Sequence, residues 1–250
     1  MEYYRDDIYR SSAYNNLANL FTTAQLYNEA ILLFDKALEL ETDSIYLAKL
    51  FLNKAVAHKK VKQYDKARID IQNALAIANQ LNDANLKFRS ANQMGLLAME
   101  TQHYDEALLH FNNANKLHFS KKTYVNLGLT YSLKEQQEEA ITQYQKAIGY
   151  TNRTATKFKA YQYLGNLYYK GDQYELAKNN YLHAKAIYPE LTNPDVEAIT
   201  LYKTLGNCYG KLDLNDLAIE SLNFSFDLMK EYNQVRDVLA VKFTQLAFIK

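Results

Sequence analysis

Residues 124–148 read YVNLGLTYSLKEQQEEAITQYQKAI, and two small residues organise this stretch. Gly128 lies between two tyrosines, one four residues before it and one three residues after it. Twelve residues after Gly128 comes Ala140, followed at intervals of four and three by Tyr144 and Ala147. Spacings of three and four place side chains on one face of an α-helix. The stretch therefore predicts two helices that face each other through small residues, joined by a short polar turn.

The same arrangement occurs six times along the chain. The first helices share a small residue, at Ala18, Ala55, Gly95, Gly128, Gly165 and Gly206. Twelve residues later, the second helices share an alanine, at Ala30, Ala67, Ala107, Ala140, Ala177 and Ala218. Small residues on facing helices let two backbones approach to about 8–10 Å. With only two prolines in the chain, little interrupts these helices. The repeat predicts antiparallel helical hairpins stacked in series.

These residues resemble the tetratricopeptide repeat, whose first helix carries an aromatic residue, Leu, Gly and Tyr, and whose second helix carries Ala, an aromatic residue and Ala. The resemblance implies an all-α fold, a right-handed superhelical solenoid of hairpins that forms a single domain over residues 1–250. We expect six units and a truncated seventh, which cover about residues 11–44, 48–81, 88–120, 121–154, 158–191, 195–232 and 235–250. The repeated alanines are 33 to 41 residues apart. Such lengths resemble the longer units of bacterial peptide-sensing regulators and kinesin light chains.

Composition argues against several classes of protein. The 29 basic and 28 acidic residues give a formal net charge of +1, without the cationic excess of a nucleic-acid or membrane-surface binder. The sequence has no apolar run of about 18 residues that would span a membrane. Its single cysteine suits a reducing compartment, and its N-terminus lacks the apolar core of a signal peptide. We expect a cytoplasmic protein with no nucleic-acid and no membrane partner.

Polar residues recur on the first helices at positions that avoid the core stripe. In a solenoid of such hairpins the first helices line the concave surface, so these residues are the predicted peptide-binding site. They are Asn15, Asn16, Asn19, Lys49, Asn53, Arg89, Gln93, Lys122, Asn126, Lys159, Tyr163, Asn166, Lys203 and Asn207. The amides can both donate to and accept from the backbone of an extended peptide. The cations would favour acidic side chains or a free C-terminus.

A more specific resemblance concerns carboxylate-clamp tetratricopeptide domains, which bind the C-terminal tails of heat-shock chaperones. The positions of the clamp fall on Asn15, Asn19, Asn53, Arg89 and Gln93. Asn19 and Asn53 match the clamp, and Arg89 is a conservative match, whereas Asn15 and Gln93 stand where the family has cations. The chain therefore lacks two of the positive charges of that clamp.

The sequence offers no support for catalysis. Its five histidines form no HxxxH or HExxH pair, and His103 and His110 are separated by a predicted turn and helix start. Cys208 follows Gly206 by two residues, at a packed position of a first helix. No glycine-rich phosphate-binding string is present. We expect a protein that is not an enzyme and that has no metal site and no cofactor.

The leading hypothesis is a non-catalytic scaffold that holds an extended polypeptide in its concave groove. The alternative is a sensory module of a larger signalling or transcription regulator that responds to a peptide. The seventh unit ends at Lys250, where its first helix should turn. An open solenoid end leaves apolar surface in water. We therefore expect either a longer parent chain or a homodimer that covers the C-terminal end.

Overall fold

The computed structural model describes the backbone of residues 2–117, 122–150, 154–188 and 194–247. Within these ranges, the side chains of residues 2–6, 8, 122, 194–195 and 234–247 are not described. The described residues form helices and no strand. The first six helices are α1 (Glu2–Thr23), α2 (Tyr27–Leu40), α3 (Ser44–Lys60), α4 (Tyr64–Gln80), α5 (Ala84–Glu100) and α6 (Tyr104–Lys116). They are followed by α7 (Lys122–Leu133), α8 (Gln137–Tyr150), α9 (Thr154–Lys170), α10 (Tyr174–Ile187), α11 (Pro194–Lys211) and α12 (Asn215–Ala247).

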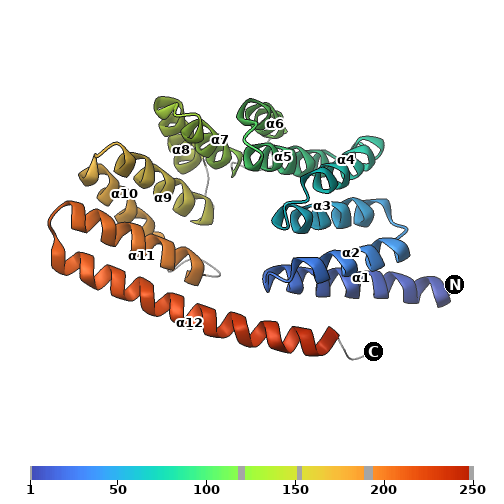
Figure 1. The fold of residues 1–250 in the computed structure, drawn as a ribbon. Coiled ribbons are helices and arrows are strands. Elements are labelled where there is room, and N and C mark those ends of the chain that lie inside the picture. Colours follow the sequence, from blue (N-terminus) through green and yellow to red (C-terminus); the bar gives the residue numbers. More distant parts are fainter. Residues whose placement is uncertain (1, 118–121, 151–153, 189–193, 248–250) are drawn as a thin grey trace. The chain divides into compact units, whose positions relative to one another are not determined.

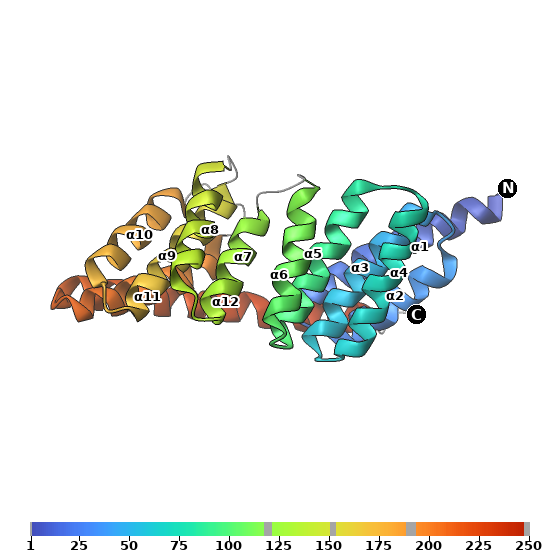
Figure 2. The same cartoon turned by 90° about the horizontal axis from the view of Figure 1, so that it is seen from above.

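The chain divides into two compact units, residues 1–119 with 238–250 and residues 120–237. In the first unit, α1 pairs with α2, α3 with α4, and α5 with α6. In the second, α7 pairs with α8 and α9 with α10, and α11 packs on α10 (Figure 1). Within each unit the hairpins stack in chain order, as the view from above shows (Figure 2). The predicted all-α repeat of helical hairpins is confirmed.

The helices begin and end where local chemistry places their boundaries. Asp43 and Asp83 cap α3 and α5, because their side chains accept hydrogen bonds from the backbone amides of Tyr46 and Leu86 at 2.9 Å. Pro194 is the first residue of α11, a position that suits proline because the backbone amide that proline lacks would have no helical partner there.

The core of each unit lies between the helices of a hairpin and between successive hairpins. The second helices α2, α4, α6, α8 and α10 bury the large residue of the repeat, namely Phe34, Ile71, Phe111, Tyr144 and Tyr181. The alanines of the repeat, four residues before and three residues after this large residue, are also buried. The backbones of the two helices in a hairpin therefore lie close together. No helix in the described ranges is both long and apolar enough to cross a membrane.

The last helix differs from the sequence prediction. A second helix that ends near residue 232 and a truncated seventh unit at 235–250 were expected. Instead, α12 continues without a turn from Asn215 to Ala247, over 33 residues. The segment after Lys211 contains neither glycine nor proline, so no residue favours a break. The side chains of the predicted seventh unit lie outside the described residues.

Candidate functional site

A cavity of about 200 Å³ opens on the first helices of the first unit. Five of its lining residues belong to the predicted peptide-binding site, namely Asn15, Asn16, Lys49, Asn53 and Arg89. They come together because α3 contacts both α1 and α5 directly, so side chains at matching positions of the three helices converge. The other lining residues are Ser11, Ser12, Glu41, Tyr46 and Leu50.

Amide side chains connect the first two hairpins at this cavity. The Nδ2 of Asn53 donates a hydrogen bond to Oδ1 of Asn15 at 3.2 Å, which joins α3 to α1. Asn19 donates to the same oxygen at 3.4 Å. Within the described part of the chain, the Asn15 Nδ2 and the Asn53 Oδ1 make no further hydrogen bond. The pair can therefore still donate to and accept from a bound peptide.

Two cations line the cavity without a carboxylate partner. Arg89 is half-buried, and burial lowers the pKa of its guanidinium. Among the described residues, no carboxylate lies within ion-pair distance of Arg89 or Lys49. The Lys49 Nζ lies 4.6 Å from the centre of the Tyr46 ring, a cation–π contact that holds the ammonium at the wall. Because a partly desolvated cation favours an anion, the cavity suits a carboxylate ligand.

The carboxylate of Glu41 also lines the cavity but is engaged elsewhere. Glu41 is 8% exposed, and its Oε2 accepts a hydrogen bond from the Ser11 hydroxyl at 2.8 Å. Its Oε1 accepts from the backbone amides of Thr42 and Asp43 at 3.1 and 3.0 Å. Oε1 thus holds the connection between α2 and α3, and Oε2 ties this connection to α1. Glu41 therefore leaves the charges of Arg89 and Lys49 available to a ligand.

A second cavity, of about 350 Å³, lies in the second unit. Its lining residues are Asn166, Tyr169, Lys170, Tyr181, Thr204 and Asn207, which come from α9, α10 and α11. The Tyr181 hydroxyl donates to Oδ1 of Asn166 at 2.8 Å, so one predicted amide is held by the core. Asn207 is exposed, and within the described residues its side chain makes no comparable hydrogen bond. The structure therefore brings two predicted residues, Asn166 and Asn207, to one place in this unit.

The remaining predicted residues line neither cavity. Gln93, Asn126 and Lys159 are half-buried on first helices, and Lys203 is exposed. Tyr163 packs into the core of the second unit, with its ring centre 6.0 Å from that of Tyr144. Lys122 is the first residue of α7, and its side chain lies outside the described residues. A peptide-binding surface that joins these residues along all the first helices stays a prediction.

Sequence reasoning missed Ser11, Glu41 and Tyr46 as lining residues of the first cavity. Glu41 follows Ala37 by four residues and thus continues the buried stripe of α2. A carboxylate at a position expected to be buried was the sequence signal that could have identified Glu41. For Tyr46 the signal was its position one helical turn before Lys49.

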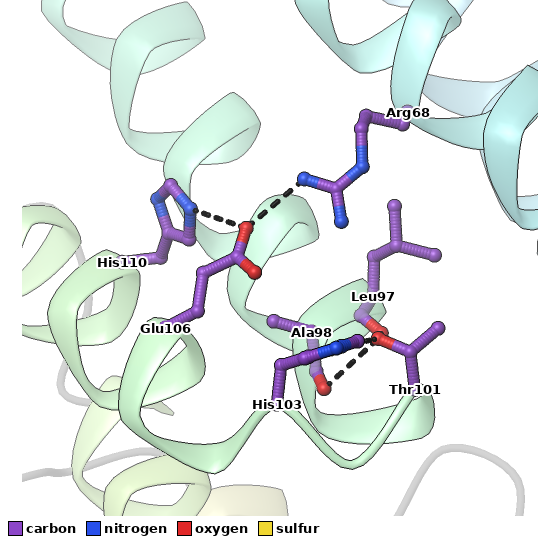
Figure 3. Close-up of polar contacts among 7 residues, drawn as sticks. All are labelled: Arg68, Leu97, Ala98, Thr101, His103, Glu106 and His110. Carbon is purple, nitrogen blue, oxygen red and sulfur yellow. Dashed lines mark hydrogen bonds and ion pairs between the residues drawn. The ribbon is translucent and has the colours of Figure 1, made fainter.

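His103 and His110, at the turn between α5 and α6 and on α6, do not converge on a metal site (Figure 3). His110 faces Glu106, whose Oε1 lies 3.5 Å from its Nε2 and 3.0 Å from the Arg68 guanidinium. His103 instead contacts the Thr101 hydroxyl at 2.9 Å. The hydrogen bond from Arg68, above all, lowers the pKa of Glu106. The described residues hold no group of three His, Cys, Asp or Glu side chains suited to a metal ion.

Two buried polar groups elsewhere, those of His58 and Cys208, have structural partners. Between α3 and α4, the His58 Nδ1 lies 2.7 Å from Oδ2 of Asp70, and both residues are buried. Cys208 is buried, its Sγ donates to the Tyr174 carbonyl at 3.2 Å, and burial raises the pKa of its thiol. A high pKa disfavours the thiolate, so Cys208 is a packing residue in an unreactive setting.

Comparison with known proteins matches two segments to tetratricopeptide repeat models, residues 10–40 and residues 122–153. No curated protein sequence matches the chain. Among solved structures, BtubC (BKLC) from P. vanneervenii is 18% identical, with 86% of this chain and 92% of that chain covered and a TM-score of 0.65. The apo form of RapI is 13% identical, with 91% and 85% covered and a TM-score of 0.66. PilF from Pseudomonas aeruginosa is 19% identical, with 86% and 90% covered and a TM-score of 0.58. At these identities the likeness concerns the fold.

Proposed function

Since this chain is a tetratricopeptide-repeat protein, we propose that it is a non-catalytic scaffold that holds an extended polypeptide segment against its first helices. Protein interaction is the general role that the repeat suggests. The finer part of the proposal is the position and chemistry of the ligand, which rest on the cavity between α1, α3 and α5.

One observation carries this proposal. Arg89 is a half-buried cation at a cavity wall, without a carboxylate partner in the described part of the chain. A cation that has lost part of its hydration gains by binding an anion. Lys49 adds a second positive charge to the same cavity. We therefore assign the cavity to an acidic side chain or a C-terminal carboxylate of the bound polypeptide.

The amide pair supplies the second part of the recognition. The unused donor of Asn15 and the unused acceptor of Asn53 face a ligand that lies along α1 and α3. Peptide groups of any sequence present both a donor and an acceptor. The amides would thus hold the backbone, while Arg89 and Lys49 select the charge.

A binding measurement with defined probes tests the proposal. The probes are fluorescein-labelled decapeptides with Asp and Glu and a free C-terminus, and matched peptides with Asn, Gln and an amidated C-terminus. We expect the acidic set to contain ligands and the double variant Lys49→Glu, Arg89→Glu to bind them at least about tenfold more weakly, since a charged hydrogen bond contributes about 1.5–3 kcal/mol.

The control is Lys66→Glu, which reverses one exposed charge on α4 away from the cavity. Its affinity and the melting temperatures of all variants should stay near those of the unchanged protein. Equal affinity for neutral and acidic peptides, or an unaffected double variant, would remove the cavity from the binding site.

A further inference from the structure

One face of α12 presents four large apolar side chains to solvent. Ile219, Leu222, Phe226 and Met229 are 60%, 39%, 61% and 42% exposed. Their spacings of three, four and three residues place them in one stripe along the helix. We call these four residues the α12 stripe.

The earlier second helices bury the position that corresponds to Leu222. Leu222 stands at the repeat position that Phe34, Ile71, Phe111, Tyr144 and Tyr181 occupy in the earlier second helices. Those five side chains are at most 1% exposed. The high exposure of Leu222 therefore reflects a missing neighbour rather than a different helix.

In the earlier hairpins, this neighbour is present: it is the first helix of the following hairpin. The helices α2, α4, α8 and α10 contact α3, α5, α9 and α11, respectively. Tyr181 of α10, for example, shares a core cluster with Leu201, Leu205 and Cys208 of α11. Leu222 thus occupies the position of an interface that is formed repeatedly within this chain, and no first helix in the described residues covers the α12 stripe.

The residues of the α12 stripe have the same spacing as the residues of α11 that cover α10. Leu201, Leu205 and Cys208 lie four and three residues apart on α11. Leu222, Phe226 and Met229 repeat the same two intervals. A second α12 could therefore cover the first one, which makes the stripe self-complementary.

The flanking charges fit an antiparallel arrangement of two such helices. Centred on Phe224, a two-fold axis would place Leu222 opposite Phe226 and Ile219 opposite Met229. On the same flank, Lys230 would then approach the acidic first turn of the other copy, where Asp216 lies. Opposite charges at that position favour the antiparallel pair.

We propose that the α12 stripe is the contact surface of a homodimer, formed by two antiparallel α12 helices. The surface differs from the one expected from the sequence, because it lies at residues 219–229 and not at the end of the chain. None of its residues lines the cavity proposed to bind a peptide, so each proposal can fail without the other.

Sedimentation velocity of the full chain between 1 and roughly 200 µM tests the pairing. We expect a concentration-dependent dimer for the unchanged protein. The variant Phe226→Glu should weaken it at least about a hundredfold, because it buries an unpaired charge in an apolar contact. Since Phe226 is mostly exposed, circular dichroism should show an intact helical fold.

The matched control is Leu109→Glu, which changes a leucine that is 59% exposed on α6. It should leave the dimer unchanged. A charge exchange probes the orientation: Lys230→Glu should weaken the dimer severalfold, and the added change Asp216→Lys should restore it.

A monomer at every concentration would overturn the homodimer. A dimer that Phe226→Glu leaves intact would also overturn it. Peptide affinity of the Phe226→Glu variant should equal that of the unchanged protein, since the first cavity is built from other helices.

Discussion

Single side chains in this chain are constrained most tightly where two helices of a hairpin touch. At Gly128, a Cβ atom would lie 2.6 Å from Cε1 of Tyr144, which is shorter than any normal contact between carbon atoms. Tyr144 is 1% exposed and packed on all sides, so its ring has no room to move away. The absence of a side chain at Gly128 thus allows a full tyrosine to fill the space between α7 and α8.

Gly128→Ala should lower the free energy of unfolding by about 1–3 kcal/mol, because overpacking outweighs the better helix propensity of alanine. The control is Gly149→Ala in the same hairpin, where a Cβ would meet no atom within 4 Å. That change should raise the free energy of unfolding by about 0.5 kcal/mol. Urea unfolding measures both, and equal effects of the two changes would contradict this packing role.

Helices and turns follow a shared design along the chain. Each hairpin turn holds a non-glycine residue with positive φ, at Gln25, Lys62, Gln102, Glu135, Asp172 and Asp213. For an L-residue this left-handed conformation costs about 1–2 kcal/mol, so each turn is mildly strained. The strain persists because the helices on both sides pack together and fix the turn.

Lys62→Gly should therefore stabilise the protein by about 1 kcal/mol, since glycine adopts the left-handed conformation freely. Lys62 has φ of 60°, whereas its neighbour Gln63 has φ of −84°. Gln63→Gly should lower stability, because there the added freedom benefits only the unfolded chain. Thermal unfolding of the two variants should give shifts of opposite sign, and shifts of the same sign would speak against strain at the turn.

A helix end near residue 232 was expected from the sequence, whereas α12 continues to Ala247. The repeat pattern favoured a new unit at Phe243 and Leu246, but a pattern of apolar residues cannot by itself end a helix. The residues between Lys211 and Lys250 include no glycine or proline. Only packing against a following helix could have forced a turn, and α12 has none in the described ranges.

The two units of the molecule use different residues at the same core position. The first unit buries Phe34, Ile71 and Phe111 there, whereas the second buries Tyr144 and Tyr181. The pKa values of Tyr144, Tyr163 and Tyr181 lie above the ordinary value near 10.0, mainly because these side chains are buried. The first unit has no tyrosine at this position, so alkaline conditions should affect the second unit more.

Above pH 10 the unfolded chain releases these phenolic protons while the folded chain retains them. The free energy of unfolding should consequently fall as the pH rises past 10, by at most about 1.4 kcal/mol per pH unit for each such tyrosine. Tyr144→Phe should leave stability at pH 8 nearly unchanged, since phenylalanine fills this position in other hairpins. At pH 11 it should be more stable than the unchanged protein by about 1 kcal/mol.

Urea unfolding at pH 8 and pH 11 measures this difference. Tyr9→Phe is the control, because Tyr9 is 67% exposed on α1. It should unfold like the unchanged protein at both pH values. An unchanged alkaline response in Tyr144→Phe would show that other groups govern it.

Much of the architecture could be predicted from local information. The hairpins, the facing small residues and the start of α11 at Pro194 all follow from spacings of three, four and twelve residues and from backbone preferences. The candidate site was predicted in part. Asn15, Lys49, Asn53 and Arg89 could be named because matching positions of stacked repeats must lie near one another.

The remaining features depend on contacts between residues far apart in the chain. The amino-acid sequence by itself determined the helices and their pairing, because helix periodicity and the need to bury one stripe act within a single hairpin. Only the tertiary structure decided that Glu41 is held by Ser11, that Tyr163 joins the core and that Leu222 stays uncovered. Each of these outcomes depends on which neighbour reaches the side chain, and a one-dimensional pattern carries no such information.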